Sequence, residues 1–229
     1  MERGLYVAAA GMAAEQVRQD LVANNLANAS TPGYKADRAR QRDFSEVLLA
    51  SRAGGGTVGL VGNGPAVLAS VTDLTPAAPH DTGQPLDLAI QGEGFFAVRT
   101  ANGVRYTRNG EFGKSPDGLL VDAAGDRVLG QDGGPVRVAA DGTVADSAVG
   151  VFAVRDATKE GANHFTGVAT GRGAGTVRTG ALEASGADPV RTMVEMMAST
   201  RAYESGQRVI QTIDDTLGKA AGQVGSLGA

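Results

Sequence analysis

The chain contains no cysteine and no tryptophan among its 229 residues, and aromatic residues make up only 4% of it. The absence of cysteine excludes disulfides and metal sites built on thiolates. The scarcity of aromatic rings means that the core must be built mainly from valine, leucine, isoleucine and alanine. A chain of this length forms one or two domains and buries a substantial core.

Positive charge and long apolar runs are also scarce. The net charge of −4 and a pI near 5.2 argue against a nucleic-acid binder. No stretch of 18 apolar residues is present, so we expect no membrane span. Residues Met1 to Tyr6 lack the basic segment and apolar core of a secretory signal. We therefore expect no cleaved signal peptide, and a role outside the cytoplasm would require another export route.

The chain has few residues suited to catalysis. Its two histidines, His80 and His164, lie far apart beside turn-like residues, and we expect both in surface loops. No nucleophile elbow, HExxH motif or phosphate loop has the required spacing. The glycines at 171–175 lack the third glycine of a dinucleotide fingerprint and predict a loop or strand bend. The acidic residues at 122–126 lack the alternating ligands of a calcium loop and predict a turn. The sequence thus predicts no enzyme, no catalytic residue, no cofactor and no metal site.

Glycine, in contrast, is abundant, with 34 residues, about twice the average usage. From Gly54, which begins a predicted loop, to about residue 185, short β-type runs alternate with turn signals. The predicted strands are residues 86–90, 94–99, 104–107, 119–121, 136–138 and 150–154. The turn signals include Asn102-Gly103, Asn109-Gly110, Asp117-Gly118, Asp132-Gly133 and Asp141-Gly142. Such dipeptides are strong hairpin signals, so the pattern predicts a compact antiparallel β domain over residues 76–185.

Residues 3–29 predict a helix that ends at Thr31-Pro32-Gly33. Two stripes recur at helical spacing on neighbouring faces. One is Leu5, Ala9, Met12, Gln16, Gln19, Ala23 and Leu26, and the other is Ala14, Val17, Leu21, Asn24 and Asn28. Two such stripes on one helix predict contact with more than one neighbour.

A second helix is predicted to begin at Asp188-Pro189, because Asp caps a helix and Pro suits its first position. A seven-residue repeat then places Met196, Ser199, Tyr203, Gly206, Ile210, Ile213 and Leu217 at a and d positions. Ser199 and Gly206 are weak core residues, but their small size would let two helices approach closely. Residues 35–75 are predicted to connect the first helix to the β domain.

The start of this connection alternates in charge. Lys35, Arg38, Arg40 and Arg42 predict a solvated face, with a docking patch for a partner as the sharper alternative.

Three asparagines, Asn24, Asn25 and Asn28, lie at the end of the first helix. Asparagine is a middling helix former, so their concentration suggests that the amides bind something specific. One hypothesis is that they fix the register between subunits, as a buried asparagine does in coiled coils. The alternative is that they fray the helix toward the Thr-Pro-Gly stop.

Five segments, in this order along the chain, resemble the bacterial flagellar basal-body rod proteins of the FlgG and FlgF type. They are residues 23–35, 86–98 (LDLAIQGEGFFAV), 106–112 (YTRNGEF), 180–190 (GALEASGADPV) and 193–217, which contains the run Arg201-Ala202-Tyr203-Glu204. The resemblance implies an α+β fold in which N- and C-terminal helices pair as a coiled-coil-like domain around a central antiparallel β domain. It divides the chain into an assembly helix at 1–34, a connecting segment at 35–75, the β domain at 76–185 and a second assembly helix at 186–229.

The resemblance also implies a structural role. Family members leave the cell unfolded through the flagellar type III export apparatus and polymerise in the periplasm, within the basal body of the cell envelope. Their terminal helices form the inner tube of a hollow drive shaft. The implied partners are copies of the chain itself and neighbouring rod or hook proteins, and contact of the outer β face with a ring or peptidoglycan stays open. The expected assembly interface is Leu5, Met12, Val17, Leu21, Asn24, Asn25, Leu26, Asn28, Met196, Tyr203, Ile210, Ile213 and Leu217.

The position along the rod is less sharply indicated. Residues 200–204 look more like a distal-rod protein, while the short Gly-rich stretch at 48–67 leaves a proximal-rod role open, and we prefer the distal rod. The alternatives are an extracytoplasmic β-domain binding module with coiled-coil ends, and a hook-type subunit of the same family. Because an isolated helix with narrow apolar stripes is marginal in water, we also expect terminal segments that are mobile in the monomer and helical in the polymer.

Overall fold

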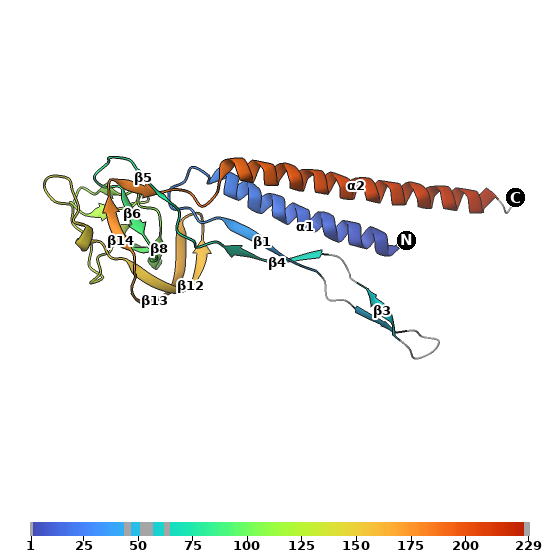
Figure 1. The fold of residues 1–229 in the computed structure, drawn as a ribbon, viewed down its shortest axis with the longest axis horizontal. Coiled ribbons are helices and arrows are strands. Elements are labelled where there is room, and N and C mark those ends of the chain that lie inside the picture. The colour runs from blue at the N-terminus through green and yellow to red at the C-terminus, as the bar shows by residue number, and fades with distance from the viewer. Residues whose placement is uncertain (1, 44–46, 51–56, 62–64, 227–229) are drawn as a thin grey trace. The chain divides into compact units, whose positions relative to one another are not determined.

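A computed structural model describes residues 2–43, 47–50, 57–61 and 65–226. The chain divides into two compact units. Unit 1 comprises Met1–Leu26, Asp37–Val71 and Pro189–Ala229, and unit 2 comprises Ala27–Ala36 and Thr72–Asp188. Unit 1 holds the two terminal helices, and unit 2 holds an antiparallel β domain (Figure 1). The predicted α+β fold class is confirmed.

The two helices of unit 1 run side by side in opposite directions. They are α1 (Glu2–Ala27) and α2 (Pro189–Ser226). A Cβ built on Gly206 would lie 2.7 Å from the Met12 Cγ atom, and one on Gly4 would lie 3.6 Å from the Ile213 Cδ1 atom. Ser199 donates a hydrogen bond to the backbone oxygen of Glu15, over 3.2 Å. These three contacts confirm the predicted heptad, because Ser199, Gly206 and Ile213 are its d positions.

The ends of both helices follow their local chemistry. α2 begins at Pro189, as predicted. Proline suits the first helical position because it has no N–H group, and an N–H at that position would find no partner within the helix. α1 ends at Ala27, two residues before the predicted end. There the chain turns, and the Thr31 amide donates to the Asn28 oxygen over 3.1 Å instead of continuing the helix.

Unit 1 also contains two short antiparallel pairs formed by the connecting segment. Strand β1 (Asp37–Asp43) pairs with β4 (Pro65–Thr72), and β2 (Val47–Ala50) pairs with β3 (Thr57–Val61). The second pair begins with Val47 opposite Val61. The loop predicted to start at Gly54 lies outside the described residues.

Unit 2 is built on a seven-stranded antiparallel sheet in the order β12-β13-β8-β7-β11-β10-β9. Its strands are β7 (Phe96–Thr100), β8 (Gly103–Thr107), β9 (Gly113–Lys114), β10 (Leu120–Val121), β11 (Arg127–Val128), β12 (Phe152–Glu160) and β13 (His164–Arg172). Two smaller pairs accompany it: β5 (Pro79–Asp81) with β15 (Ala181–Glu183), and β6 (Leu88–Gln91) with β14 (Thr176–Thr179). A short 3₁₀ turn, η1, spans Asp146–Ala148.

Consecutive residues of β7 pack into two separate hydrophobic cores. Phe96 and Val98 lie in one cluster, whereas Ala97 lies in a second cluster with Tyr106 and Phe165. This follows from the pleat of a strand, which sends successive side chains to opposite faces. Most of the few aromatic rings lie in these two cores, and valine and leucine supply much of the remaining buried apolar surface.

Most of the predicted turns are confirmed. Asn102-Gly103 closes the β7–β8 hairpin and Asp117-Gly118 closes the β9–β10 hairpin. Asp132-Gly133 and Asp141-Gly142 are tight turns in which the glycines have φ of 78° and 81°. Residues 122–126 also turn, as expected, because the Asp122 carboxylate accepts the amides of Ala124 and Asp126.

Three local predictions were wrong. Asn109-Gly110 makes no hairpin, because Gly110 passes against the Leu88 backbone so closely that a Cβ would lie 1.6 Å from its oxygen. At the predicted strand 136–138, Val136 and Val138 are buried, but within the described residues the segment forms a single bridge, between Arg137 and Leu119. The histidines lie in strands instead of loops: His80 in β5 opposite Leu182, and His164 at the start of β13.

Candidate functional site: assembly surfaces and a buried junction

The face of α1 that contacts α2 differs from both predicted stripes. It passes through Gly4 and Glu15, which belong to neither stripe, and shares only Met12 with the first stripe. Within one chain, Met12 of the first stripe packs against α2 and Ala14 of the second stripe is buried, whereas Leu5 and Val17 remain exposed. Their exposure is compatible with contacts to other copies.

The residues of the expected interface fall into three groups. Those left exposed are Leu5, Val17, Asn24 and Leu217; those half-buried are Met12, Leu21, Leu26, Asn28, Met196, Tyr203, Ile210 and Ile213; and the buried one is Asn25. Leu217 is 39% exposed despite its a position. The reason is that Gly4, near the start of α1, already lies beside Ile213, so little of α1 remains to cover the next turn of α2.

Asn25 acts within the chain. Its side-chain Nδ2 donates to the Asp37 oxygen over 2.7 Å, and its Oδ1 accepts the Asp37 amide over 3.0 Å. The amide side chain thus satisfies both backbone groups of the first residue of β1, in the manner of a neighbouring strand. Asn25 joins the end of α1 to the start of β1 inside unit 1, which accounts for one of the three asparagines.

Asn28 belongs to unit 2. Its Oδ1 accepts the Thr31 hydroxyl over 3.3 Å, and its backbone oxygen accepts the Ser185 hydroxyl over 2.9 Å. The segment after α1 is therefore bonded to the segment before α2. Residues 28–31 and 185 lie in the first and fourth motifs of the family resemblance.

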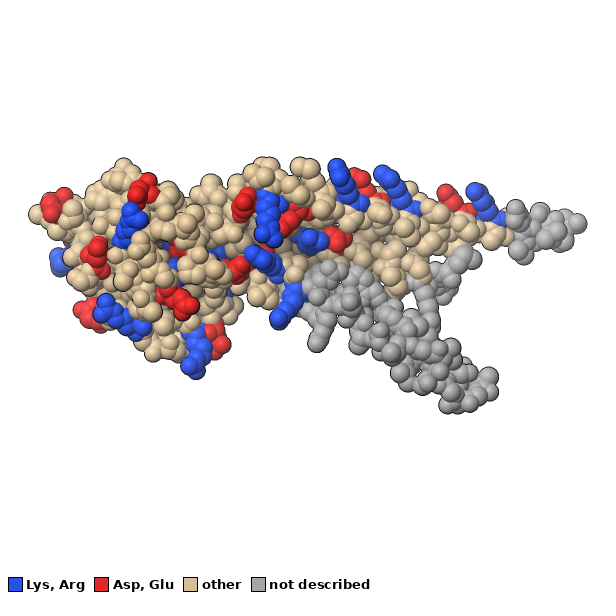
Figure 2. Space-filling view, in the orientation of Figure 1, with Lys and Arg blue, Asp and Glu red and all other residues tan. Residues whose placement is uncertain are grey.

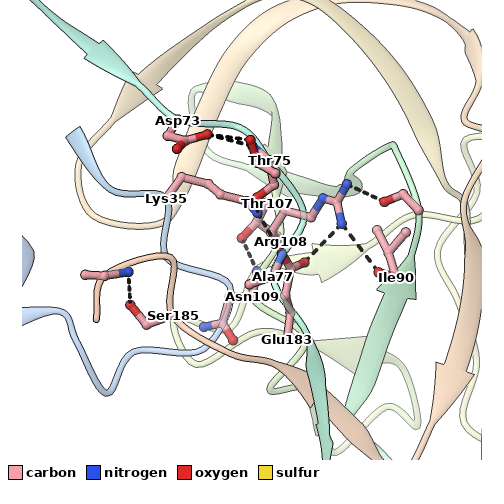
Figure 3. Close-up of polar contacts among 12 residues, drawn as sticks. Lys35, Asp73, Thr75, Ala77, Ile90, Thr107, Arg108, Asn109, Glu183 and Ser185 are labelled. Atoms are coloured by element: carbon pink, nitrogen blue, oxygen red, sulfur yellow. Dashed lines mark hydrogen bonds and ion pairs between the residues drawn. The ribbon is translucent and has the colours of Figure 1, made fainter. Parts of the chain in front are cut away.

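A buried ion cluster joins the same two segments at a second point (Figure 3). Lys35 Nζ donates to Glu183 Oε1 over 2.6 Å and to the Thr75 oxygen over 2.7 Å. Arg108 donates through a terminal nitrogen to Glu183 Oε2 over 3.0 Å. One carboxylate thus balances two cations in a site where Lys35 and Glu183 are each only 1% exposed. We call these three residues the buried junction.

Burial sets the electrostatics of the junction. It lowers the pKa of Lys35 below its usual range, against the opposing pull of the Glu183 carboxylate. The prediction that Lys35 belongs to a solvated face was wrong, because its ammonium is enclosed and donates to Thr75 and Glu183. Arg38 and Arg40 are exposed, as that prediction required, and the side chain of Arg42 lies outside the described residues.

The backbone around the junction is packed too closely for larger residues. Gly33 has φ of +66°, and a Cβ on it would lie 2.2 Å from the Arg108 carbonyl carbon. Its amide donates to the Glu183 oxygen over 2.9 Å. The neighbouring Tyr34 is fully buried, and Lys159 Nζ lies 3.9 Å from the centre of its ring. The Pro-Gly-Tyr-Lys segment is therefore a tightly fitted part of unit 2.

Sequence reasoning missed the junction as a unit, although each member lies in a quoted motif. Lys35 ends the first motif, Arg108 lies in the third and Glu183 lies in the fourth. The signal that could have revealed it is the presence of a charged residue inside otherwise apolar or glycine-rich segments. Such charges are rarely buried unless they are paired.

No catalytic constellation is visible in the part of the chain that the structure describes. No group of three or more His, Asp or Glu side chains there is placed to hold a metal ion. Within that part, no helix is both long and apolar enough to cross a membrane. The charges of the buried junction bond to one another, although the buried Arg108 Nε atom has no hydrogen-bond partner among the described residues.

Comparison with known proteins gives these features a family. Three family models match in order: "Flagella basal body rod protein" over residues 5–35, "Flagellar hook protein FlgE/F/G D1 domain" over 89–150, and "Flagellar basal body rod FlgEFG protein C-terminal" over 178–223. The flagellar basal-body rod protein FlgF of Caulobacter vibrioides is 31% identical, with 100% of this chain and 99% of that protein covered. The chain belongs to the flagellar basal-body rod family.

Other rod proteins align over similar lengths. FlgF of Salmonella typhimurium is 31% identical over 96% of this chain and 97% of its own length. FlgG of Bacillus subtilis is 29% identical over 95% and 97%. The chain is therefore a structural subunit of the bacterial flagellar basal-body rod and not an enzyme. The names of these relatives do not favour the hook-type alternative.

Proposed function

We propose that the rod subunit polymerises through α1 and α2, whose outward surfaces bind other copies. The observation that supports this most directly is that pairing within the chain leaves Leu5, Val17 and Leu217 exposed on the two helices. Burial of such side chains in a neighbouring copy contributes roughly 1.5–3 kcal/mol each. The expected interface residues on α1 and α2 are proposed to act in this way, with the exception of Asn25, Met12 and Ile213, which make contacts within the chain.

In this proposal the predicted segments keep separate tasks. The assembly helices are supplied by residues 1–34 and 186–229. The connection from the first helix to the β domain is formed by residues 35–75, and the outer β domain by residues 76–185. The buried junction supports this division, because it bonds the segment that follows α1 to the segment that precedes α2. The two segments that continue into the assembly helices are thereby bonded to each other within unit 2.

The proposed route and place follow the family resemblance. The subunit passes through the flagellar type III export apparatus without a cleaved signal peptide and assembles in the periplasm. Its proposed neighbours are further copies and other rod or hook proteins, with a ring or peptidoglycan outside. The proposed rod is hollow and transmits torque from motor to hook.

We place the subunit in the distal rod on the resemblance of residues 200–204. Relatives named FlgG and FlgF align equally well, so the position needs an experiment. Deletion of the gene, followed by electron microscopy of isolated basal bodies, is that experiment. Rods that stop at their distal part support the distal position, and rods that stop near the base assign the subunit to the proximal rod instead.

The register role of the remaining asparagines has its own test. Asn24 is exposed on α1, so Asn24→Leu should leave the monomer folded. If Asn24 sets the register between copies, this variant forms few or irregular rods. Normal rods from Asn24→Leu would assign the asparagine to the local helix end.

A further inference from the structure

Two apolar patches lie at opposite ends of the helix pair of unit 1. The base patch is formed by Val190, Met193, Val194 and Met197 in the first turns of α2, and Val190 and Val194 are 72% and 60% exposed. The tip patch is formed by Leu5 and Tyr6 in the first turns of α1, and Tyr6 is 64% exposed. Both patches are larger than the isolated exposed apolar residues that need no explanation.

The patches point away from each other. Val190, Val194 and Met197 follow one another at spacings of four and three, on the side of α2 opposite to Ser199 and Gly206, which face α1. Tyr6 lies two residues, or about 200°, around α1 from Gly4, which faces α2. The pairing of Gly4 with Ile213 places the tip patch about 30 Å along α2 from the base patch.

We infer that the tip patch of one copy binds the base patch of the next. This inference rests on the proposed self-polymerisation and specifies which surfaces carry it. The two patches face opposite directions. A second copy in the same orientation, shifted along the helix axis, can therefore place its tip patch against the base patch of the first copy. Such a head-to-tail contact leaves one free patch at each end, and so it continues into an open polymer.

The alternative is contact between like patches. Binding of tip to tip or base to base uses the same surface on both copies and closes at a dimer. A closed dimer does not build the rod to which the family belongs. The head-to-tail arrangement is therefore the one that uses both patches and leads to a rod.

Charged residues of both signs lie beside both patches. Arg201 continues the exposed stripe of the base patch, at the spacing of the next helical turn. At the tip, Asp214 and Asp215 are exposed within one turn of Leu217. Glu195 lies beside Val194 in the base patch and Lys219 lies within one turn of Leu217, so each end carries both signs of charge and the apolar side chains carry the contact. Figure 2 shows that the charged side chains on the visible face of the helix pair are spaced apart, with uncharged surface between them.

The absence of cysteine makes a cross-linking experiment clean. The double variant Tyr6→Cys with Val194→Cys is assembled, treated with a short bis-maleimide, and run on a denaturing gel. We expect a ladder of covalent oligomers from the double variant and only monomer from either single variant. Tyr6→Cys with Val168→Cys is the matched control, because Val168 is equally exposed but lies on β13 of unit 2, and it should give no ladder.

Each outcome decides between the arrangements. Dimers from a single variant would establish contact between like patches and overturn the inference. Wild-type assembly together with no ladder from the double variant would also overturn it, while self-polymerisation would stand. A wild-type chain that forms no assembly at high concentration would contradict the proposed self-polymerisation itself.

A second measurement needs no cross-linker. Val194→Asp blocks the base patch and Tyr6→Asp blocks the tip patch, and each should raise the concentration needed for assembly about tenfold or more. An equal mixture of the two variants retains one functional contact, and we expect it to sediment as a heterodimer. Circular dichroism checks that both variants stay folded. Assembly of either variant at the wild-type concentration would overturn the inference.

Discussion

Lys35 and Glu183 lie 148 residues apart in the chain, yet their side chains meet at 2.6 Å in the interior of unit 2. Arg108 binds the other carboxylate oxygen of Glu183. Glu183 also accepts the Ala77 amide over 2.8 Å (Figure 3). Its carboxylate therefore bonds its own segment of unit 2 to three others, those of Lys35, Ala77 and Arg108. The stability of this unit should therefore depend strongly on a single carboxylate.

Replacing Glu183 by glutamine is the first prediction. Glu183→Gln keeps the shape of the side chain but leaves two buried cations without a counter-charge, and we expect a loss of about 3–5 kcal/mol in the free energy of unfolding. Urea denaturation followed by circular dichroism measures it. Glu160→Gln is the matched control, since Glu160 pairs with Arg105 at the surface and should cost below about 1 kcal/mol. Equal losses from both variants would contradict the central role of Glu183.

The ionisation of Lys35 provides the second prediction. The chain has only four lysines, so NMR of labelled lysine side chains can follow each of them. Burial lowers the pKa of Lys35, and we expect it to titrate below 10.5, the usual pKa of a lysine side chain. Between the two pKa values the unfolded chain binds more protons at this group than the folded chain does. The contribution of Lys35 to the free energy of unfolding therefore rises with pH over that interval. Titration of Lys35 at or above 10.5 would contradict the prediction.

Gly33 tests how tightly the segment before the junction is packed. Gly33→Ala combines a left-handed backbone with a Cβ 2.2 Å from the Arg108 backbone, and we expect a loss of about 2–5 kcal/mol in stability. Gly83→Ala is the control, because Gly83 also has a positive φ, of 72°, but faces open space. Its cost should stay near the 1–2 kcal/mol of the backbone conformation alone. Thermal unfolding of both variants gives the comparison, and equal costs would mean that the close contact contributes nothing.

Asn25 gives a prediction about unit 1. Asn25→Ala removes the side chain that satisfies both backbone groups of Asp37, and we expect a cost of about 1–3 kcal/mol. Hydrogen exchange provides a direct readout, since the Asp37 amide should lose its protection. Gln16→Ala, at an exposed position of α1, should leave this amide unchanged. An Asp37 amide that exchanges equally slowly in both variants would show that another group protects it.

The sequence predicted what depends on local patterns. The heptad from Met196 to Ile213 and the Asn102-Gly103 hairpin are short-range signals, and both appear in the structure. The inward face of α1 was not predictable in the same way, because alanines occur all around that helix and mark no single stripe. The buried junction joins residues 75 and 148 positions apart, and no local pattern specifies such a pairing. Its three charges could be recognised as candidates only by their place within the family motifs.

The helix pair should open more easily than the β domain. Within a single chain, α1 and α2 meet partly through glycine and serine, and they expose the tip and base patches to water. Their opening therefore removes less apolar contact than unfolding of the two cores of unit 2 does. In dilute monomer we expect trypsin to cut first at Arg201 and Arg208 of α2, before Arg99 and Arg127 in the sheet. In the assembled sample the sites in α2 should become resistant, because neighbouring copies cover the helices. Mass spectrometry of a digestion time course identifies the order of cleavage. Terminal helices as resistant as the β domain in dilute monomer would show that the pair is already stable alone, and assembly would then add contacts without ordering the helices.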